Sequence, residues 1–295
     1  MRGKIIIGIA VIVIVIISTL VLETSVKKSS EFTIEVTPFN IDHKGKGRAM
    51  SAQGDNIFEV WVYEDEMTTT EENGVAIFDH MYFGLKPENN EIYNEFGIQN
   101  DPQKTVFVVP IFTITAYGDG GFYDFYNGKC DEKCIKEIPI RHDLPTNYQT
   151  NDNSIKVLRL LGYPFITDLE IEKNPDILKK FDKVIMLHSE YVTKNEFDAV
   201  THHPKVIYLH PNSLFAEVEY SQQNDTLTLI RGHGYPSSEI KNGFNWKYDN
   251  TYPYEFDNQC KSWKFYEIDN GIMLNCYPEK IIFTEKNLLK IIKEY

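Results

Sequence analysis

Two side chains with catalytic chemistry follow the short apolar run "VIML" at residues 184–187. His188 and Glu190 come directly after it. An imidazole can transfer a proton near neutral pH, and a carboxylate can hold a metal ion or act as a base. The next polar residues have a structural explanation, since Thr193 is placed to cap a helix and Glu196, three residues on, completes a capping box. No comparable structural role explains His188 and Glu190, so they are candidate site residues.

Two further polar clusters follow apolar runs. His210 and Asn212 come after "KVIYL", and the run at 105–111 leads into the polar and aromatic stretch "FTITAYGDGGFYDFYNG". That stretch holds Tyr117, Asp119, Tyr123, Asp124, Tyr126 and Asn127. If the three apolar runs are parallel strands of one sheet, their carboxyl ends share an edge, which is where ligands bind in such sheets. The three clusters are therefore expected to converge.

The pattern from residue 154 onward predicts that sheet. "SIKVLRLLGY" reads as a helix with Ser154 at its N-cap and Gly162 at its end. A strand in "PFITD", a helix in "NPDILKKF", a strand in "KVIMLH", a helix in "TKNEFDAVTHH" and a strand in "KVIYLHP" follow. Continuous apolar strands that alternate with helices indicate a parallel sheet covered on both faces. We predict a three-layer α/β fold of the flavodoxin type.

The flanking regions have strand patterns. Short β-rich segments such as "IFEVWVY" precede residue 105, and "TLTLIRGHGY", "WKFYEI" and "GIMLNCY" follow Val218, the last two joined by a hairpin turn at Asp-Asn-Gly. "EKNLLKIIKEY" closes the chain as a helix. The predicted organisation is a signal anchor and tether at 1–30, a β-rich part at 31–104, and an α/β domain with added strands at 105–295.

The N-terminus predicts a membrane anchor. The apolar run begins at Ile5 and continues to Leu22, close to the ~20 residues that a spanning helix needs. Arg2 and Lys4 favour a cytoplasmic N-terminus. A cleaved signal peptide is the alternative, although "TLVLETSV" has no A-x-A-like cleavage site. The main domain is then extracytoplasmic in both cases, either anchored through residues 5–22 or secreted.

The composition of the chain indicates which classes of partner it can bind. The 295-residue chain has a net charge of -13, which disfavours nucleic acid because phosphate binding needs clustered Lys and Arg. Aromatic residues at 13% supply enough core material for a folded domain.

The four cysteines form two pairs that are local in sequence. In an oxidising compartment, Cys130 is expected to bond Cys134, and Cys260 to bond Cys276, although four cysteines allow three connectivities. A zinc site is the weaker alternative because neither pair has the C-x2-C spacing.

Several stretches resemble one enzyme family. "HSEYV" at 188–192 and "FDAV" at 197–200 are similar to a strand end reading His-Pro-Glu-Tyr-Trp and the helix after it. "LLGYPFITDLEI", "VIYLHPNSLF" and "TAYG" at 115–118 have counterparts in the same family. The stretch from about 105 to 245 thus resembles the C-terminal glutamine-amidotransferase-like domain of the N,N-dimethylformamidase large subunit, a fold relative of the ThuA-like proteins.

This resemblance implies a mononuclear iron site. The family holds one ferric ion with two tyrosine phenolates and the glutamate of this motif, so Glu190 and Tyr117 would be ligands. Tyr148 in "LPTNYQT" would be the second tyrosine, with Tyr123 and Tyr126 as substitutes. Phenolate and carboxylate oxygens suit a hard ion of high charge.

The resemblance also implies roles for His188 and Asn212, which would assist amide hydrolysis by moving a proton and steadying an oxyanion. The sequence departs from the family pattern where a Gly-Gly pair has become His210-Pro211 and a later glycine has become Ser213. "RGHGYP" adds a further candidate, because two glycines flank His233 and indicate a tight turn or close backbone approach.

Two functions remain open. The first is an exported, membrane-anchored, metal-dependent hydrolase that acts on a carbon-nitrogen bond of a small amide. The second is a non-catalytic exported domain that binds a small ligand or a cell-envelope partner through the same sheet edge. A serine hydrolase is disfavoured because the sequence has no G-x-S-x-G.

Overall fold

The protein is described here by a computed structural model that covers residues 48–51, 55–69, 76–78, 81–98, 101, 103–142, 151–248 and 260–295. All of these belong to one compact unit, Val36–Tyr295. The expected anchor and tether at 1–30 and the candidate ligand Tyr148 lie outside the described residues. Within the described ranges, no helix has the length and apolar character needed to cross a membrane.

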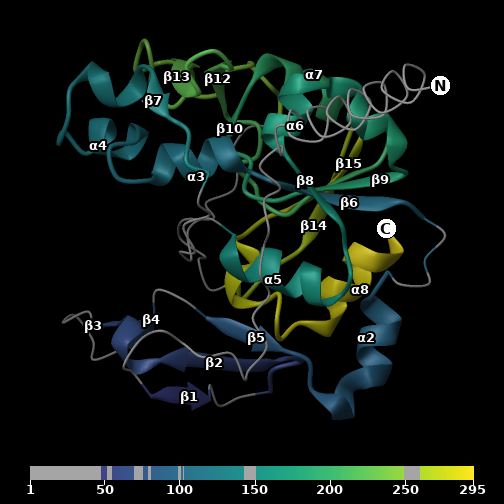
Figure 1. Ribbon diagram of the computed structural model, residues 1–295. Helices are drawn as coiled ribbons and strands as arrows, with labels where there is room; N and C mark the ends of the chain where they lie inside the picture. The colour runs from purple at the N-terminus through teal and green to yellow at the C-terminus, as the bar shows by residue number, and fades with distance from the viewer. Residues whose placement is uncertain are drawn as a thin grey trace, which may run out of the picture. The chain divides into compact units, whose positions relative to one another are not determined.

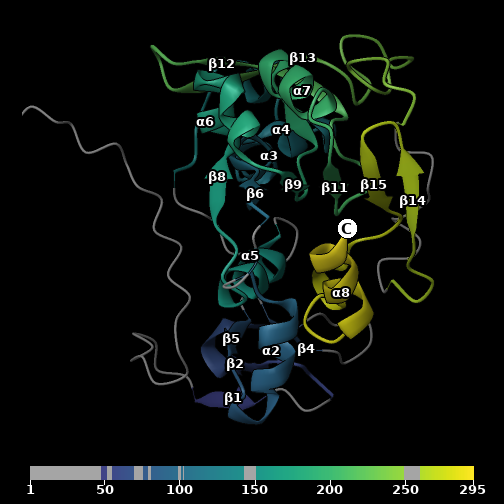
Figure 2. The same cartoon turned by 90° about the vertical axis from the view of Figure 1, so that its right-hand side faces the viewer.

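A six-stranded sheet forms the centre of the unit (Figure 1). The strand order is β14 (Phe265–Ile268), β15 (Gly271–Leu274), β11 (Val206–Tyr208), β9 (Lys183–Met186), β6 (Thr105–Val109) and β8 (Phe165–Thr167). Figure 2 shows this order from right to left. Only β14 runs antiparallel to its neighbour, through the expected hairpin. The predicted parallel α/β arrangement is confirmed.

Helices cover both faces of this sheet (Figures 1 and 2). On one face lie α6 (Asp168–Lys173), the 3-10 helix η5 (Pro175–Lys180) and α7 (Lys194–Thr201). Their Ile171, Leu178 and Val200 belong to one buried core with alternate sheet residues, among them Val106, Val108, Val184, Met186 and Val206. The other face carries α5 (Asp152–Leu160) and α8 (Lys286–Glu294). There the buried Lys183 amine donates to the Ile292 and Lys293 carbonyls at the end of α8, each at 2.9 Å.

Smaller sheets flank the centre. One has the order β10 (Tyr191–Val192), β12 (Ala216–Ser221), β13 (Thr226–Arg231) and β7 (Ile138–Pro139). A second joins β1 (Ala49–Ser51), β2 (Glu59–Tyr63) and β5 (Tyr82–Gly84), and β3 (Met67–Thr69) pairs with β4 (Ala76–Phe78). The remaining elements are η1 (Glu64–Glu66), η2 (Pro87–Asn89), α2 (Asn90–Phe96), α3 (Ile111–Tyr117), α4 (Phe122–Tyr126), η3 (Glu132–Ile135) and η6 (Pro278–Lys280). The boundary expected near residue 104 stays a prediction.

The stretch after β6 is a helix, not the predicted continuation of a strand into a loop. β6 ends at Val109, Pro110 stands at the N-cap position, and α3 begins at Ile111. Proline has no N–H to donate to a strand ladder, and its fixed φ suits a helix start. The carboxylate of Asp168 accepts the Phe112 N–H at 2.7 Å, so a residue distant in sequence caps this helix. The β-branched "IFTIT" favoured a strand by propensity, which tertiary burial overrides.

The start of α5 also differs from the prediction. The helix begins at Asp152, with Asn151 at its N-cap in a left-handed conformation (φ 69°), so Ser154 lies in the first turn and is not the cap. The buried carboxyl group of Glu279 accepts the Asn153 N–H at 2.7 Å and the Ser154 N–H at 3.2 Å. Burial raises the pKa of this group to about 8, and its oxygens satisfy N–H groups that the first turn of a helix leaves free. The predicted stop at Gly162 is confirmed, with φ 85°.

Both predicted disulfides are present, Cys130–Cys134 and Cys260–Cys276, with sequence separations of 4 and 16. We expect their removal to have unequal effects, because a longer closed loop restricts the unfolded chain more. Cys260→Ser combined with Cys276→Ser should lower the free energy of unfolding by about 3 kcal/mol, and the matched Cys130→Ser, Cys134→Ser pair by about 2 kcal/mol. Denaturant titration measures both, and a larger loss from the short loop would contradict this order.

Glu196 does not complete the predicted capping box. The Thr193 hydroxyl accepts the Glu196 N–H at 3.2 Å, as expected, but it donates to Glu172 at 2.5 Å. Both carboxyl oxygens of Glu196 are buried without a hydrogen-bond partner. Burial, together with the charges of Asp168 and Glu172, raises the pKa of Glu196 well above its ordinary value. The folded protein therefore holds a proton here that the unfolded chain releases at lower pH.

This arrangement predicts a pH dependence of stability. Because the folded state binds the extra proton, the free energy of unfolding should fall as the pH rises above the ordinary carboxyl pKa of 4.5. Glu196→Met should flatten that slope and, by removing an unpartnered buried carboxyl, raise stability at pH 7.5 by about 1–3 kcal/mol. Glu239→Gln, at an exposed position, is the control. Parallel pH profiles for Glu196→Met and the wild type would refute the assignment.

Candidate functional site

The candidate residues meet where three parallel strands end. β6, β9 and β11 are neighbours in the sheet and run in the same direction. Their carboxyl ends therefore lie at one edge, and each continues into one of the polar clusters: α3 with Tyr117, the segment with His188 and Glu190, and the turn with His210. The predicted convergence follows from this strand order.

The segment that carries His188 and Glu190 is fixed through its backbone. The Glu190 carbonyl accepts the Phe215 and Ala216 N–H groups, both at 2.9 Å, where β10 pairs with β12. The His188 N–H donates to Asn151 Oδ1 at 3.0 Å. Because neighbours on different elements hold this backbone, the two side chains have defined directions.

Glu190 is the centre of the cluster. Its side chain has no exposed surface, and its Oε2 accepts the Tyr117 hydroxyl at 2.7 Å. The Tyr123 hydroxyl in turn donates to the Tyr117 oxygen at 2.8 Å. His188 Nε2 lies 3.2 Å from the same Oε2, and His233 Nε2 lies 3.7 Å from Oε1, which has no hydrogen-bond partner. Two phenols, one carboxylate and two imidazoles therefore converge within a few ångströms.

The electrostatics of the cluster favour an ionised Glu190. Burial alone would raise the pKa of this carboxyl, but the hydrogen bond and charge of His188, the charge of His233 and the Tyr117 hydroxyl outweigh it, and the pKa lies below its ordinary value. Burial, and then the charge of Glu190, raise the pKa values of Tyr117 and Tyr123. In the absence of a cation, both phenols are thus protonated hydrogen-bond donors.

Aromatic rings support His188 from the side. His210 stacks on it with ring centroids 3.8 Å apart, and the Tyr277 ring lies edge-on to both imidazoles at 5.3 and 4.0 Å. Asn212 joins this group through its backbone, since its N–H donates to His210 Nδ1 at 3.1 Å. The Asn212 side chain is buried and its Oδ1 has no hydrogen-bond partner.

The structure thus brings Tyr117, His188 and Glu190 into direct contact, and places Asn212 beside them through His210. Tyr148 lies outside the described residues, and Tyr123, which the sequence offered as a substitute, occupies the position of a second phenol. The signal for Tyr123 was its place in a glycine-bounded turn: Gly118 and Gly121 flank the reversal between α3 and α4, which carry the two tyrosines.

The donor set fits a hard metal ion. Phenol and carboxylate oxygens 2.7–2.8 Å apart can share one ion, and the partnerless, buried Oε1 of Glu190 offers a further donor atom. Across the described parts of the chain, no group of three or more His, Cys, Asp or Glu side chains is arranged to hold a metal. An ion at this site would therefore depend on the tyrosines.

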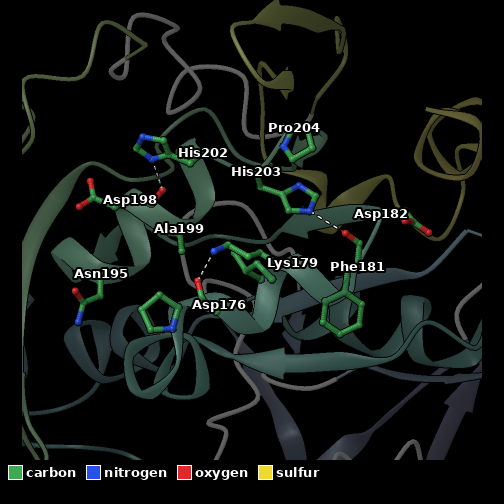
Figure 3. Close-up of a pocket in the computed structure, with 12 residues that line it drawn as sticks. Asp176, Lys179, Phe181, Asp182, Asn195, Asp198, Ala199, His202, His203 and Pro204 are labelled. Carbon is green, nitrogen blue, oxygen red and sulfur yellow. Dashed lines mark hydrogen bonds and ion pairs between the residues drawn. The ribbon is translucent and has the colours of Figure 1, made fainter.

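A hollow of about 600 Å³, away from this cluster, lies between η5 and α7 (Figure 3). Its polar groups are engaged locally: Lys179 pairs with Asp176 at 2.7 Å, and His202 Nδ1 lies 2.7 Å from the Asp198 carbonyl. His202 is exposed, whereas the adjacent His203 is buried. It is 6% exposed, with Nε2 3.0 Å from the Phe181 carbonyl. No convergent site forms among these residues.

A scan against models of known protein families found no match to the chain, and a search of curated proteins found none either.

Asn151 connects the His188 backbone to the start of α5 through one hydrogen bond. Replacing Asn151 should therefore lower the free energy of unfolding by a measurable amount. Asn151→Gly keeps the left-handed backbone but leaves the buried His188 N–H without its acceptor, so we expect a loss of about 1–3 kcal/mol in the free energy of unfolding. Asn151→Ala should cost about 1 kcal/mol more, since alanine disfavours positive φ. Equal stability of Asn151→Gly and the wild type in denaturant titration would show that the His188 N–H is satisfied otherwise.

Proposed function

We propose that this protein is a metal-dependent hydrolase of a small amide, related to the N,N-dimethylformamidase large subunit through a glutamine-amidotransferase-like α/β domain. The observation that carries the proposal is the chain Tyr123–Tyr117–Glu190, with separations of 2.8 and 2.7 Å, at the carboxyl edge of a parallel sheet. Two phenols and one carboxylate are the ligand types that the sequence resemblance implies. Tyr117 and Glu190 are 73 residues apart in sequence, and their contact in the fold supports the proposal.

In this proposal, Tyr117, Tyr123 and Glu190 hold one iron ion. When bound, the ion supplies Lewis acidity toward an amide carbonyl and toward water. The pKa of Glu190 lies below the ordinary value, so this side chain would offer a carboxylate to the ion, and Tyr117 and Tyr123 would bind it as phenolates, with their protons released to solvent.

His188 and Asn212 act beside the ion. His188 Nε2 lies 3.2 Å from Glu190 Oε2, close enough to take up or release a proton at the edge of the donor set. His210 and Tyr277 hold its ring in place. Asn212 has a buried side chain available to orient a polar substrate group.

We further propose that the domain is exported and anchored in the membrane by residues 5–22. Two disulfides support an oxidising compartment. The net charge of -13 supports a partner other than nucleic acid.

Metal content of the purified full-length chain tests the ligand set. We expect about one iron per chain and a visible phenolate-to-iron absorption band in the wild type. Glu190→Gln and Tyr117→Phe should lose both, because each removes a charged donor while keeping its volume. Tyr220→Phe is a matched control, since its hydroxyl bonds Asp225 away from the cluster. A folded wild type that holds no stoichiometric metal would refute this assignment.

Hydrolysis of simple N-alkyl amides, followed by amine release, tests the activity. His188→Gln should retain iron and lower kcat by about 10²–10⁴-fold if this imidazole transfers a proton. A metal-loaded wild type that binds amides without cleaving them would favour the second function, an exported domain that recognises a small ligand or a cell-envelope partner through the same edge.

A further inference from the structure

His233 has a backbone conformation that residues other than glycine rarely adopt. Its φ is 53°, and the flanking Gly232 and Gly234 have φ values of 113° and 80°. A residue with a side chain costs about 1–3 kcal/mol in such a region, and strained positions cluster at functional sites. We explain this strained backbone by the contacts that it allows the His233 imidazole to make.

The turn is held firmly in this conformation. The His233 N–H donates to the Lys241 carbonyl and the Gly234 N–H to the Ile240 carbonyl, each at 2.7 Å. A Cβ at Gly232 would lie 2.9 Å from Ala216 Cα, so the turn packs closely against the strand β12. Ala216 also donates its N–H to the Glu190 carbonyl. One backbone network therefore fixes His233 relative to Glu190.

The imidazole points at two of the three groups proposed to hold the ion, Glu190 and Tyr123. His233 Nε2 lies 3.7 Å from Glu190 Oε1, the oxygen without a hydrogen-bond partner, and 3.5 Å from the Tyr123 hydroxyl oxygen. Its ring stacks on Tyr126 at 4.3 Å. Ligand atoms bound at about 2.0–2.2 Å to one ion lie roughly 3–4 Å apart, which is the range of these separations.

His188 and His233 differ in a way that separates their roles. His188 has no exposed surface and approaches Oε2, which already accepts the Tyr117 hydroxyl. The His233 side chain is 34% exposed and approaches the free Oε1. His233 therefore lies on the more exposed side of the cluster, next to the Glu190 oxygen that has no hydrogen bond.

We propose that His233 Nε2 is a fourth protein ligand, which completes a set of two phenolates, one carboxylate and one imidazole for a hard transition-metal ion such as ferric iron. This rests on the proposed function and extends its ligand set, since the family pattern supplies only oxygen donors. An added neutral nitrogen donor leaves fewer open positions and strengthens retention of the ion without adding negative charge.

His233→Gly in the full-length chain tests this ligand. Glycine adopts positive φ without strain, so the fold should persist, and circular dichroism with the melting temperature verifies that. We expect iron affinity, measured by competition with a chelator, to fall at least about tenfold. Added imidazole should restore it, because the vacated position is partly exposed. The matched control is His202→Ala, which removes an exposed histidine distant from the site and should leave affinity unchanged.

Pulsed electron paramagnetic resonance gives a direct second readout. In ferric wild-type protein, a coordinated imidazole nitrogen should modulate the electron spin echo, and His233→Gly should lose that modulation. Unchanged affinity or unchanged nitrogen modulation in His233→Gly would overturn the inference and leave the Tyr117, Tyr123 and Glu190 set intact. A wild type that holds no iron would instead refute the proposed function, and with it this extension.

Discussion

The buried carboxylate of Glu190 is the constraint on which the surrounding structure depends. An ionised carboxylate without exposed surface is costly unless neighbours compensate its charge. Here the neighbouring His188 imidazole, together with the His233 imidazole and the Tyr117 phenol from two other segments of the chain, provides that compensation, and Oε1 is left without a hydrogen bond. The hydrogen bonds of the carboxylate are therefore made by Oε2, whereas Oε1 faces the His233 imidazole at 3.7 Å without a hydrogen bond.

The parallel strand order is what assembles this cluster. β6, β9 and β11 are adjacent and parallel, so the residues that follow them emerge at the same edge although they are far apart in sequence. The fourth contributor, His233, comes from outside the central sheet. It follows β13, whose partner β12 holds the Glu190 backbone through β10. The small sheet thus places His233 next to the residues that the central sheet positions.

Much of this could be predicted from local patterns, and the failures share one cause. The apolar runs before His188 and His210 gave the strands and their shared edge, because strand periodicity and strand-helix alternation are local signals. Glu279 capping α5 and Asp168 capping α3 could not be found, since each acts on a helix distant in sequence. The choice among Tyr148, Tyr123 and Tyr126 depended on how α4 folds back on α3, which is also a tertiary property.

His210 supports His188 from one side. Its ring stacks on the His188 ring, with centroids 3.8 Å apart. Burial, and then the charge of His188, hold the pKa of His210 well below its ordinary value, so this ring is neutral. Its Nδ1 accepts the Asn212 N–H, which leaves the ring proton on Nε2. A neutral, oriented ring thus packs against His188, and a residue without a side chain at position 210 would leave that face of the imidazole unsupported.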